Sequence, residues 1–187
     1  RLVAPGFSAG ATIEAEMESA HDAVVGIAAS GTTPWVLAVI AQARQLGAIT
    51  VGLTCAPESP LAHAVDIPIV PVVGPEVISG SSRMKAGTAQ KMVLNMLSTA
   101  TMIRLGKVYG NLMVDLSAKS DKLCDRAERI IMTVTGVSRR KAAALLKRAK
   151  GEARTAVVMH VRKVDYAEAK RLLKEADGFL RDVIDEG

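Results

Sequence analysis

The feature that most constrains the fold is a short apolar run followed by a turn of small, hydroxyl-bearing residues. Residues 23–27 (AVVGI) are apolar without interruption, and turn residues bound them on both sides. Such a run is typical of a buried strand in a parallel sheet. Pro34 follows the turn where a helix can begin, because the first helical turn does not need the N–H that proline lacks. The segment therefore predicts a strand, a tight turn and a helix.

The turn consists of Ser30, Gly31, Thr32 and Thr33, and it has the composition of an anion-binding site. Three of these four residues carry a hydroxyl group, and the glycine lets the backbone approach a ligand closely. Backbone N–H groups at the start of the following helix, together with the helix dipole, favour a phosphate. Because a plain helix cap needs only one hydroxyl, we predict that residues 30–33 bind a phosphate group.

Strands and helices then alternate along residues 21–118. A helix is expected at 35–46, a second strand at 49–54, and a short or edge strand at 67–73, which contains two prolines. Residues 85–105 are expected to form a long helix buried between the sheet and another surface, since few of them are charged. This alternation predicts an α/β fold with a parallel sheet, and ligands at the carboxyl ends of its strands.

From about residue 119 the chain changes character, and we expect a small helical subdomain over residues 119–187. Helices are expected at 121–134, 139–150 and 166–176. The β-branched stretch 155–161 is expected to be a strand that rejoins the sheet. Residues 1–20 are left unassigned.

Composition argues against several functional classes. With 187 residues, 49% of them hydrophobic, the chain can form a real core, yet no apolar run reaches the roughly 18 residues of a membrane-spanning helix. The first residues lack the apolar core of a signal peptide, so a cytoplasmic location is expected. A net charge of +5 weakly favours anionic ligands, but 3% aromatic residues leave little for base stacking. We therefore expect that the protein does not bind nucleic acid and does not associate with a membrane.

Cysteine and histidine are too scattered to suggest a metal site. Cys55 and Cys124 lie far apart in the sequence, and we expect both to be reduced thiols. The histidines are isolated from one another and from the cysteines. No metal is expected, because a metal site needs ligands at short, defined spacings.

A second polar cluster lies between residues 76 and 90. Ser81 and Ser82 belong to a flexible, hydroxyl-rich turn, and Lys85 begins the predicted long helix. Glu76 could accept hydrogen bonds from sugar hydroxyls or move a proton. A solvated loop beside a capped helix explains the local sequence equally well, and both interpretations stay open.

Longer blocks of the sequence resemble a known family. Residues 24–34 (VVGIAASGTTP) look like the second phosphate-loop motif of the N-acetylmuramic acid 6-phosphate etherases. Residues 79–99 and 106–115 are similar to further blocks of that family. The resemblance runs from about residue 22 to the C-terminus, and on it the chain is identified as a member of the family.

The resemblance implies a sugar isomerase (SIS) type domain, which is a flavodoxin-like α/β/α sandwich, followed by a small helical subdomain. It also implies a homodimer with its active site near the subunit interface, and no metal or other cofactor. Members of the family are lyases that remove D-lactate from N-acetylmuramic acid 6-phosphate in bacterial cell-wall recycling. Their route is β-elimination followed by water addition, with glutamates as acid and base.

The resemblance also assigns site residues. Ser30, Gly31 and Thr33 would hold the 6-phosphate. Around the sugar would lie Glu76, Ser81, Ser82 and Lys85. Thr32 stands where the family usually has arginine, so one expected positive charge is absent.

Two family elements have no counterpart in the sequence. One is an earlier Gly- and Ser-rich phosphate loop, and the other is a Glu-Gly-Ala-Glu-Asp block that supplies a catalytic carboxylate. The catalytic residues are therefore unassigned, with Glu14, Glu16 and Glu18 as weak candidates for a displaced acid. An etherase is the leading hypothesis. A non-catalytic sugar-phosphate sensor, as in the related glucokinase regulatory proteins, is the alternative, and residues 79–115 argue against a sugar-phosphate isomerase.

Overall fold

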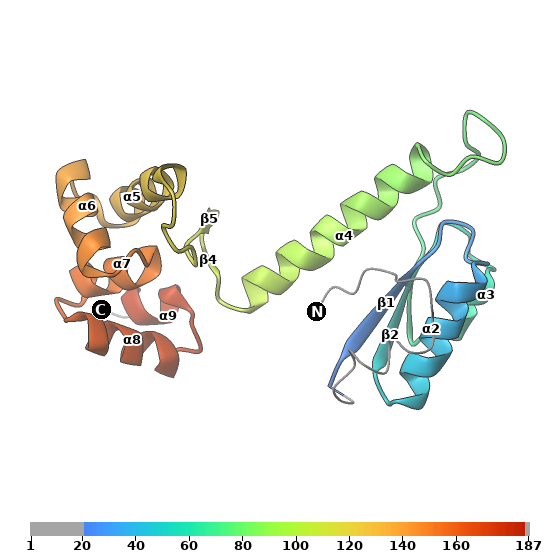
Figure 1. Ribbon diagram of the computed structural model, residues 1–187, viewed down its shortest axis with the longest axis horizontal. Helices are drawn as coiled ribbons and strands as arrows, with labels where there is room; N and C mark the ends of the chain where they lie inside the picture. The colour runs from blue at the N-terminus through green and yellow to red at the C-terminus, as the bar shows by residue number, and fades with distance from the viewer. Residues whose placement is uncertain (1–20, 186–187) are drawn as a thin grey trace. The chain divides into compact units, whose positions relative to one another are not determined.

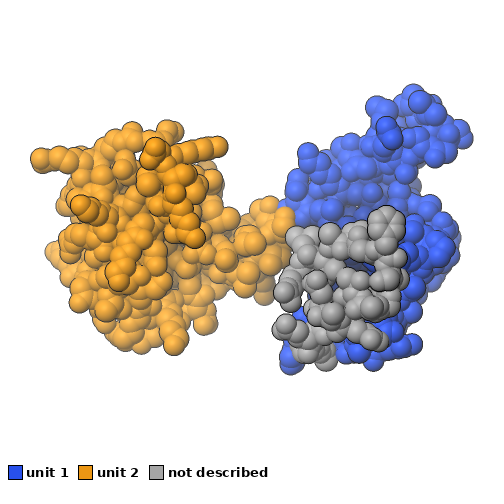
Figure 2. Space-filling view, in the orientation of Figure 1, with its two compact units in different colours: residues 1–96 blue, residues 97–187 orange. Residues whose placement is uncertain are grey.

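The computed structural model describes residues 21–185, which belong to two compact units (Figures 1 and 2). Unit 1 comprises residues 1–96 and unit 2 comprises residues 97–187. Glu14, Glu16 and Glu18, the candidates for a displaced acid, lie outside the described residues. The division falls within a long helix, whereas the sequence predicted a domain boundary near residue 118, which stays a prediction.

Unit 1 is built on a parallel sheet with the strand order β1-β2-β3. The strands are β1 (Ala23–Ile27), β2 (Ile49–Leu53) and β3 (Ile67–Ile69). Helix α2 (Pro34–Gln45) links the first two strands, and the short helix α3 (Pro60–Ala64) links the second and third. The predicted α/β fold with a parallel sheet is therefore confirmed (Figure 1). The proline-containing third strand is as short as expected.

Glycines on the two central strands let these helices pack closely on the sheet. Gly26 and Gly52 are paired in register. A Cβ atom on Gly26 would lie 3.0 Å from a side-chain carbon of Ile40 in α2. On Gly52 it would lie 2.9 Å from Val65, next to α3. The core of unit 1 fills this interface, and its buried residues are Ala28, Val36, Ile40, Leu61 and Val65.

A buried threonine joins the second and third strands. The carboxylate of Asp66 accepts hydrogen bonds from both the backbone N–H and the hydroxyl of Thr50, at 2.9 and 2.7 Å. The Asp66 N–H in turn donates to the Thr50 hydroxyl at 3.1 Å. Thr50 is fully buried, so these bonds satisfy a hydroxyl that has no access to water.

Helix α4 (Lys85–Arg104) has the predicted length but not the predicted burial. Ala86 is its only fully buried residue, and large apolar side chains such as Met92 and Met96 are more than half exposed. The expectation that the sheet covers this helix was therefore wrong for the single chain. A low charge density alone does not distinguish a core helix from one that exposes an apolar surface.

Unit 2 contains a short hairpin followed by a bundle of helices. Strands β4 (Val108–Tyr109) and β5 (Leu112–Met113) pair antiparallel. The helices that follow are α5 (Asp121–Thr135), α6 (Arg139–Arg148), α7 (Ala153–Val161), α8 (Tyr166–Glu175) and α9 (Leu180–Ile184). Ser120 and Asp165 cap α5 and α8 through their side chains.

The predicted strand at residues 155–161 was wrong, because this segment forms most of helix α7. Residues 155–159 are all buried, and α7 contacts α5, α6, α8 and α9. A helix enclosed on every side needs apolar residues around its whole circumference, so it has no 3.6-residue pattern to recognise. Its β-branched residues then mimic a buried strand.

Arg154 connects three segments of unit 2. Its guanidinium donates to the Gly178 carbonyl at 2.8 Å and to the Gly106 carbonyl at 3.3 Å. It also forms an ion pair with Asp115 at 2.9 Å. The side chain is only 20% exposed, so these contacts are well shielded from water.

Both cysteines are free, as predicted. Within residues 21–185, no helix has the length and apolar character needed to cross a bilayer.

Candidate functional site

The turn at residues 30–33, predicted to bind phosphate and called the phosphate turn below, lies at the carboxyl end of β1 and leads directly into α2. Ser30, Thr32 and Thr33 are exposed, while Gly31 is buried. Thr33 is the N-cap residue of α2, but its side chain forms no capping hydrogen bond, and no acidic residue lies in the first helical turn. The positive end of this helix therefore has no side-chain cap and no carboxylate beside it. Its backbone N–H groups are available to an anion, as an anion site requires.

The hydroxyls of the turn are already oriented toward each other. Ser30 Oγ and Thr32 Oγ1 lie 2.9 Å apart, and the Thr32 N–H points toward Ser30 Oγ at 3.4 Å. This arrangement groups two hydroxyls and a backbone donor on the exposed side of the turn. Such short donors suit a compact dianion better than long, flexible side chains do.

Gly31 is fixed by its surroundings. Its φ of +67° favours glycine, and a Cβ at this position would collide with the side chain of Ser59. The Gly31 carbonyl accepts the Leu61 N–H at 3.0 Å, and its own N–H donates to the Ala28 carbonyl at 3.0 Å. The role of Gly31 is therefore to anchor the turn against α3 rather than to present its own N–H to a ligand.

The buried hydroxyls of Thr54 and Ser59 pack against the turn and hold it, and the sequence did not predict this pair. Thr54 Oγ1 donates to the Ala29 carbonyl at 3.2 Å, and Ser59 Oγ lies 3.3 Å from Thr54 Oγ1. Ser59 also accepts the Ala62 N–H at 3.3 Å and so caps α3. The signal was present as Ser59 followed by proline, which is a typical helix start, and Thr54 at the end of a strand.

Glu76 caps the long helix α4. Its two carboxylate oxygens accept the backbone N–H groups of Lys85 and Ala86, each at 3.1 Å. These hydrogen bonds, first the one from Lys85 and then the one from Ala86, lower the pKa of Glu76 below its ordinary value. Glu76 is therefore an ionised acceptor. Each oxygen keeps a lone pair that can accept a sugar hydroxyl, but the group is poorly suited to donate a proton at neutral pH.

The other predicted members of this cluster lie on the same loop and helix start. The Lys85 ammonium donates to the Pro75 carbonyl at 2.8 Å, which turns it back over the residue preceding Glu76. Ser81 is half-buried and Ser82 is exposed, and the Ser81 N–H closes a turn on the Ile78 carbonyl at 3.1 Å. The alternative interpretation, a capped helix beside a solvated loop, is thus correct for the local contacts.

Cys55 is hydrogen-bonded beside the phosphate turn. Its N–H donates to the Ala29 carbonyl at 2.9 Å, immediately before the phosphate turn. Burial raises the pKa of its thiol, and the nearby charge of Glu76 raises it further. Cys55 follows β2, so its bond to Ala29 lies at the edge of the sheet where the phosphate turn also lies. This is where ligands collect in parallel α/β sheets.

Within the part of the chain that the structure describes, no group of three or more histidine, cysteine, aspartate or glutamate side chains is arranged to hold a metal ion. The candidate site consists instead of hydroxyls, a helix N-terminus, an ionised carboxylate and one ammonium group.

Comparison with known proteins identifies the family. The model of the SIS domain matches residues 8–100, a range that begins within the segment left unassigned from the sequence. An N-acetylmuramic acid 6-phosphate etherase from Edwardsiella ictaluri is 54% identical over 168 residues, which is 90% of this chain and 56% of that protein. The chain belongs to the N-acetylmuramic acid 6-phosphate etherase family.

Other relatives agree. N-acetylmuramic acid 6-phosphate etherase 2 from Vibrio cholerae is 52% identical over 90% of this chain and 55% of its own length. An etherase from Serratia proteamaculans is 52% identical over 87% of this chain and 55% of its own length. The chain thus spans about half the length of these curated relatives. The resemblance seen in the motifs of the sequence is confirmed for the family.

Proposed function

We propose that the chain acts in an N-acetylmuramic acid 6-phosphate etherase, a carbon–oxygen lyase that cleaves the D-lactyl ether to give N-acetylglucosamine 6-phosphate and D-lactate. The observation that carries the proposal is the open N-terminus of α2, which follows a turn with three exposed hydroxyls. The relatives are named for this activity and are 52% and 54% identical to the chain over 168 aligned residues, which supports the same substrate.

In this proposal the phosphate turn holds the 6-phosphate. Ser30 and Thr32 donate their hydroxyls, Thr33 contributes its backbone at the helix start, and Gly31 keeps the turn close to α3. The pairing of Ser30 with Thr32 at 2.9 Å supports the first assignment, because a dianion can replace that mutual bond with two stronger charge-assisted ones.

Glu76, Ser81, Ser82 and Lys85 are proposed to surround the sugar. Glu76 would accept a sugar hydroxyl with a lone pair not used by α4. Lys85 would contribute one of the two ammonium hydrogens that its bond to Pro75 leaves available. Glu76 is not proposed as the proton donor of the elimination, since its pKa is lowered.

We further propose that the protein works as a cytoplasmic homodimer. The support is the apolar surface of α4, where Met92, Met96 and Ile103 are each about half exposed. Contiguous exposed apolar side chains of this kind are typical of subunit interfaces. Sedimentation equilibrium would give twice the mass of one chain, and Met96→Glu is expected to shift it toward the mass of a single chain.

The experiment for the activity is incubation of the chain with N-acetylmuramic acid 6-phosphate and measurement of released D-lactate. Release of lactate supports the etherase. Binding of the sugar phosphate without release would overturn the catalytic role and favour the sensor. If the chain neither binds the sugar phosphate nor releases lactate, the whole assignment is contradicted.

A further inference from the structure

A hollow on the helical unit, separate from the phosphate turn, is lined by positive charges. It lies between α6, the end of α7 and the loop that leads to α8, and its volume is about 410 Å³. Lys141, Arg148 and Lys163 lie at its exposed rim, and His160 is half-buried beside them. We refer to this hollow, whose floor is formed by Leu145, Met159 and Val164, as the basic groove.

The rim charges of the basic groove are not neutralised within the described part of the chain. None of Lys141, Arg148 and Lys163 forms an ion pair there. The carboxylate of Asp165 also lines the groove, but it accepts the Glu168 N–H at 2.9 Å and caps α8. The pKa of His160 is lowered by burial and by the charge of Lys141, as expected where positive charge is not offset.

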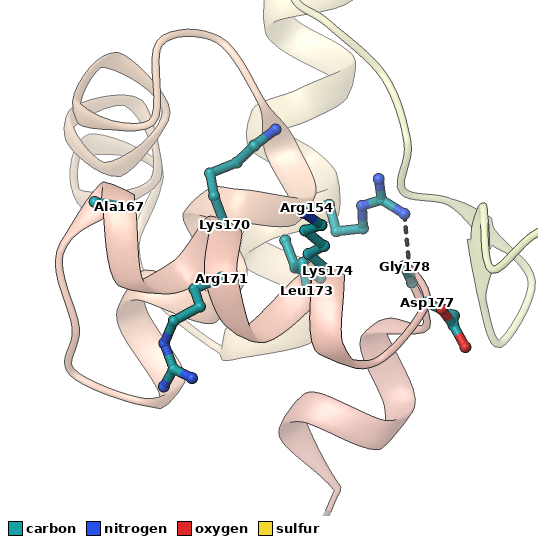
Figure 3. A pocket seen from close by; sticks show the side chains of 8 residues that line it. All are labelled: Arg154, Ala167, Lys170, Arg171, Leu173, Lys174, Asp177 and Gly178. Atoms are coloured by element: carbon teal, nitrogen blue, oxygen red, sulfur yellow. Dashed lines mark hydrogen bonds between the residues drawn. The ribbon is translucent and has the colours of Figure 1, made fainter.

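Figure 3 shows a second hollow in the same unit, which provides the contrast. All but one of its cations are paired with carboxylates. Arg154 pairs with Asp115, and Lys170 pairs with Glu152 at 3.0 Å. Arg171 is held by carboxylates on both sides, each at 2.5 Å. Positive side chains are therefore common on this unit, and the rim cations of the basic groove differ from most of those in the second hollow because they have no carboxylate partner within residues 21–185.

The floor of the basic groove is apolar. Leu145 and Met159 are each 6% exposed, and Val164 is half-buried between the rim charges. Asp165 already caps α8, and α7 ends at the groove, so neither of these helices offers an open N-terminus there. A compact phosphate would find only long, flexible donors. The groove instead suits a ligand that combines separated negative charges with an apolar group.

We propose that the basic groove docks an acidic segment of a partner protein, in which carboxylates flank one apolar side chain. Lys141 and Arg148 are seven residues apart on α6, or about 10 Å along the helix, so their long side chains can reach two carboxylates four residues apart, about 13 Å, in an extended peptide. Those carboxylates would pair with the rim, and the residue midway between them, which points to the same face, would cover Leu145. The inference does not rest on the proposed enzymatic function.

Nucleic acid is a poorer occupant. The residues that line the groove include no Phe, Tyr or Trp, so bases would have no aromatic surface on which to stack. A nucleic acid would also leave the apolar floor uncovered. Binding of duplex DNA is therefore included in the test as an outcome against the proposal.

The test is fluorescence anisotropy with a labelled, short acidic peptide that has one central leucine, added to the full chain at low salt. Two altered peptides serve as comparisons. One has alanine in place of the leucine, and the other has glutamine in place of each acidic residue. We expect binding that weakens as salt rises, a several-fold loss on replacing the leucine, and loss of binding for the uncharged peptide.

Two variants of the rim and a matched control locate the binding. Lys141→Gln and Arg148→Gln are each expected to weaken peptide binding several-fold. Lys174→Gln removes the same charge from an exposed lysine of the other hollow and is expected to leave binding unchanged. Because all three side chains are exposed, their melting temperatures should match the unaltered chain.

Several results would overturn the proposal. They are no peptide binding, an equal loss with Lys174→Gln, tighter binding of duplex DNA than of the peptide, or displacement of the peptide by equimolar inorganic phosphate. The chain could also self-associate. If the peptide does not reverse that self-association but Arg148→Gln abolishes it, the groove binds a second copy of the chain instead. Movement of the His160 ring resonance on peptide addition, with His63 unmoved, would support the location.

Discussion

Gly31 and Ser59 lie so close together that no side-chain carbon fits between them. The contact joins the phosphate turn to the start of α3, and Gly31 also takes a φ of +67° that other residues rarely adopt. The turn is therefore held in place by packing from one side, while its hydroxyls remain exposed on the other.

Gly31→Ala should destabilise unit 1 by about 2–5 kcal/mol, because left-handed backbone strain and overpacking against Ser59 add together. Urea unfolding would measure it. Gly80→Ala is the matched control, since Gly80 also has a positive φ, +82°, but a Cβ there meets nothing within 4 Å. It should cost only about 1 kcal/mol. Equal losses for the two variants would contradict the tight contact.

Thr50→Val tests the junction between the second and third strands. Valine has nearly the same shape but leaves the Asp66 carboxylate and N–H without their hydroxyl partner. We expect a loss of roughly 1–3 kcal/mol in the free energy of unfolding. Thr101→Val removes an exposed hydroxyl that only bonds back to its own helix, and it should change stability by less than about 0.5 kcal/mol.

The capping role of Glu76 predicts a dependence of stability on pH. Backbone hydrogen bonds lower its pKa in the folded chain, so its stabilising effect is complete above the ordinary glutamate value of about 4.3. That effect is lost as the pH falls through the lower, folded pKa.

Thermal melts between about pH 5 and pH 3 are the measurement for Glu76. Glu76→Gln should melt at a lower temperature than the unaltered chain at neutral pH, with the gap narrowing as the pH falls. Glu58→Gln makes the same charge change on a highly exposed side chain. A gap that stays constant with pH for Glu76→Gln would show that the carboxylate does not cap α4.

Arg154→Met should destabilise unit 2 by roughly 2–4 kcal/mol, because the carbonyls of Gly106 and Gly178 and the carboxylate of Asp115 lose a shielded donor. Arg171→Met breaks two ion pairs on the exposed surface of the same unit and should leave the melting temperature almost unchanged. Calorimetry of both variants would decide. A larger effect for Arg171 would contradict this account.

Local sequence patterns predicted the sheet and the position of the turn at residues 30–33 well, because the residues there carry local signals. Each local pattern determines one element: the apolar run at 23–27 forms the strand, the residues at 30–33 form the turn, and Pro34 begins the helix. The support beneath the turn was missed. It depends on contacts between Thr54, Ser59 and Gly31, which come from separate segments, and no local pattern brings them together.

The helical unit was harder to predict. The buried helix α7 resembled a strand, because enclosure by other helices overrides the β preference of residues such as Val157 and Val158. The hairpin of β4 and β5 was missed although Gly110 and Asn111 form a typical two-residue turn between short apolar runs. The exposure of α4 also depends on what packs around it, which its own sequence does not specify.

The most direct test of the central claim is calorimetric titration of N-acetylmuramic acid 6-phosphate into the chain and into Ser30→Ala. Ser138→Ala, which removes a serine that makes no capping bond in unit 2, is the control. We predict binding to the unaltered chain and the control, and a loss of roughly 1–3 kcal/mol for Ser30→Ala, the strength of a hydrogen bond to a charged group. Equal affinity for all three proteins would show that the phosphate does not bind at this turn.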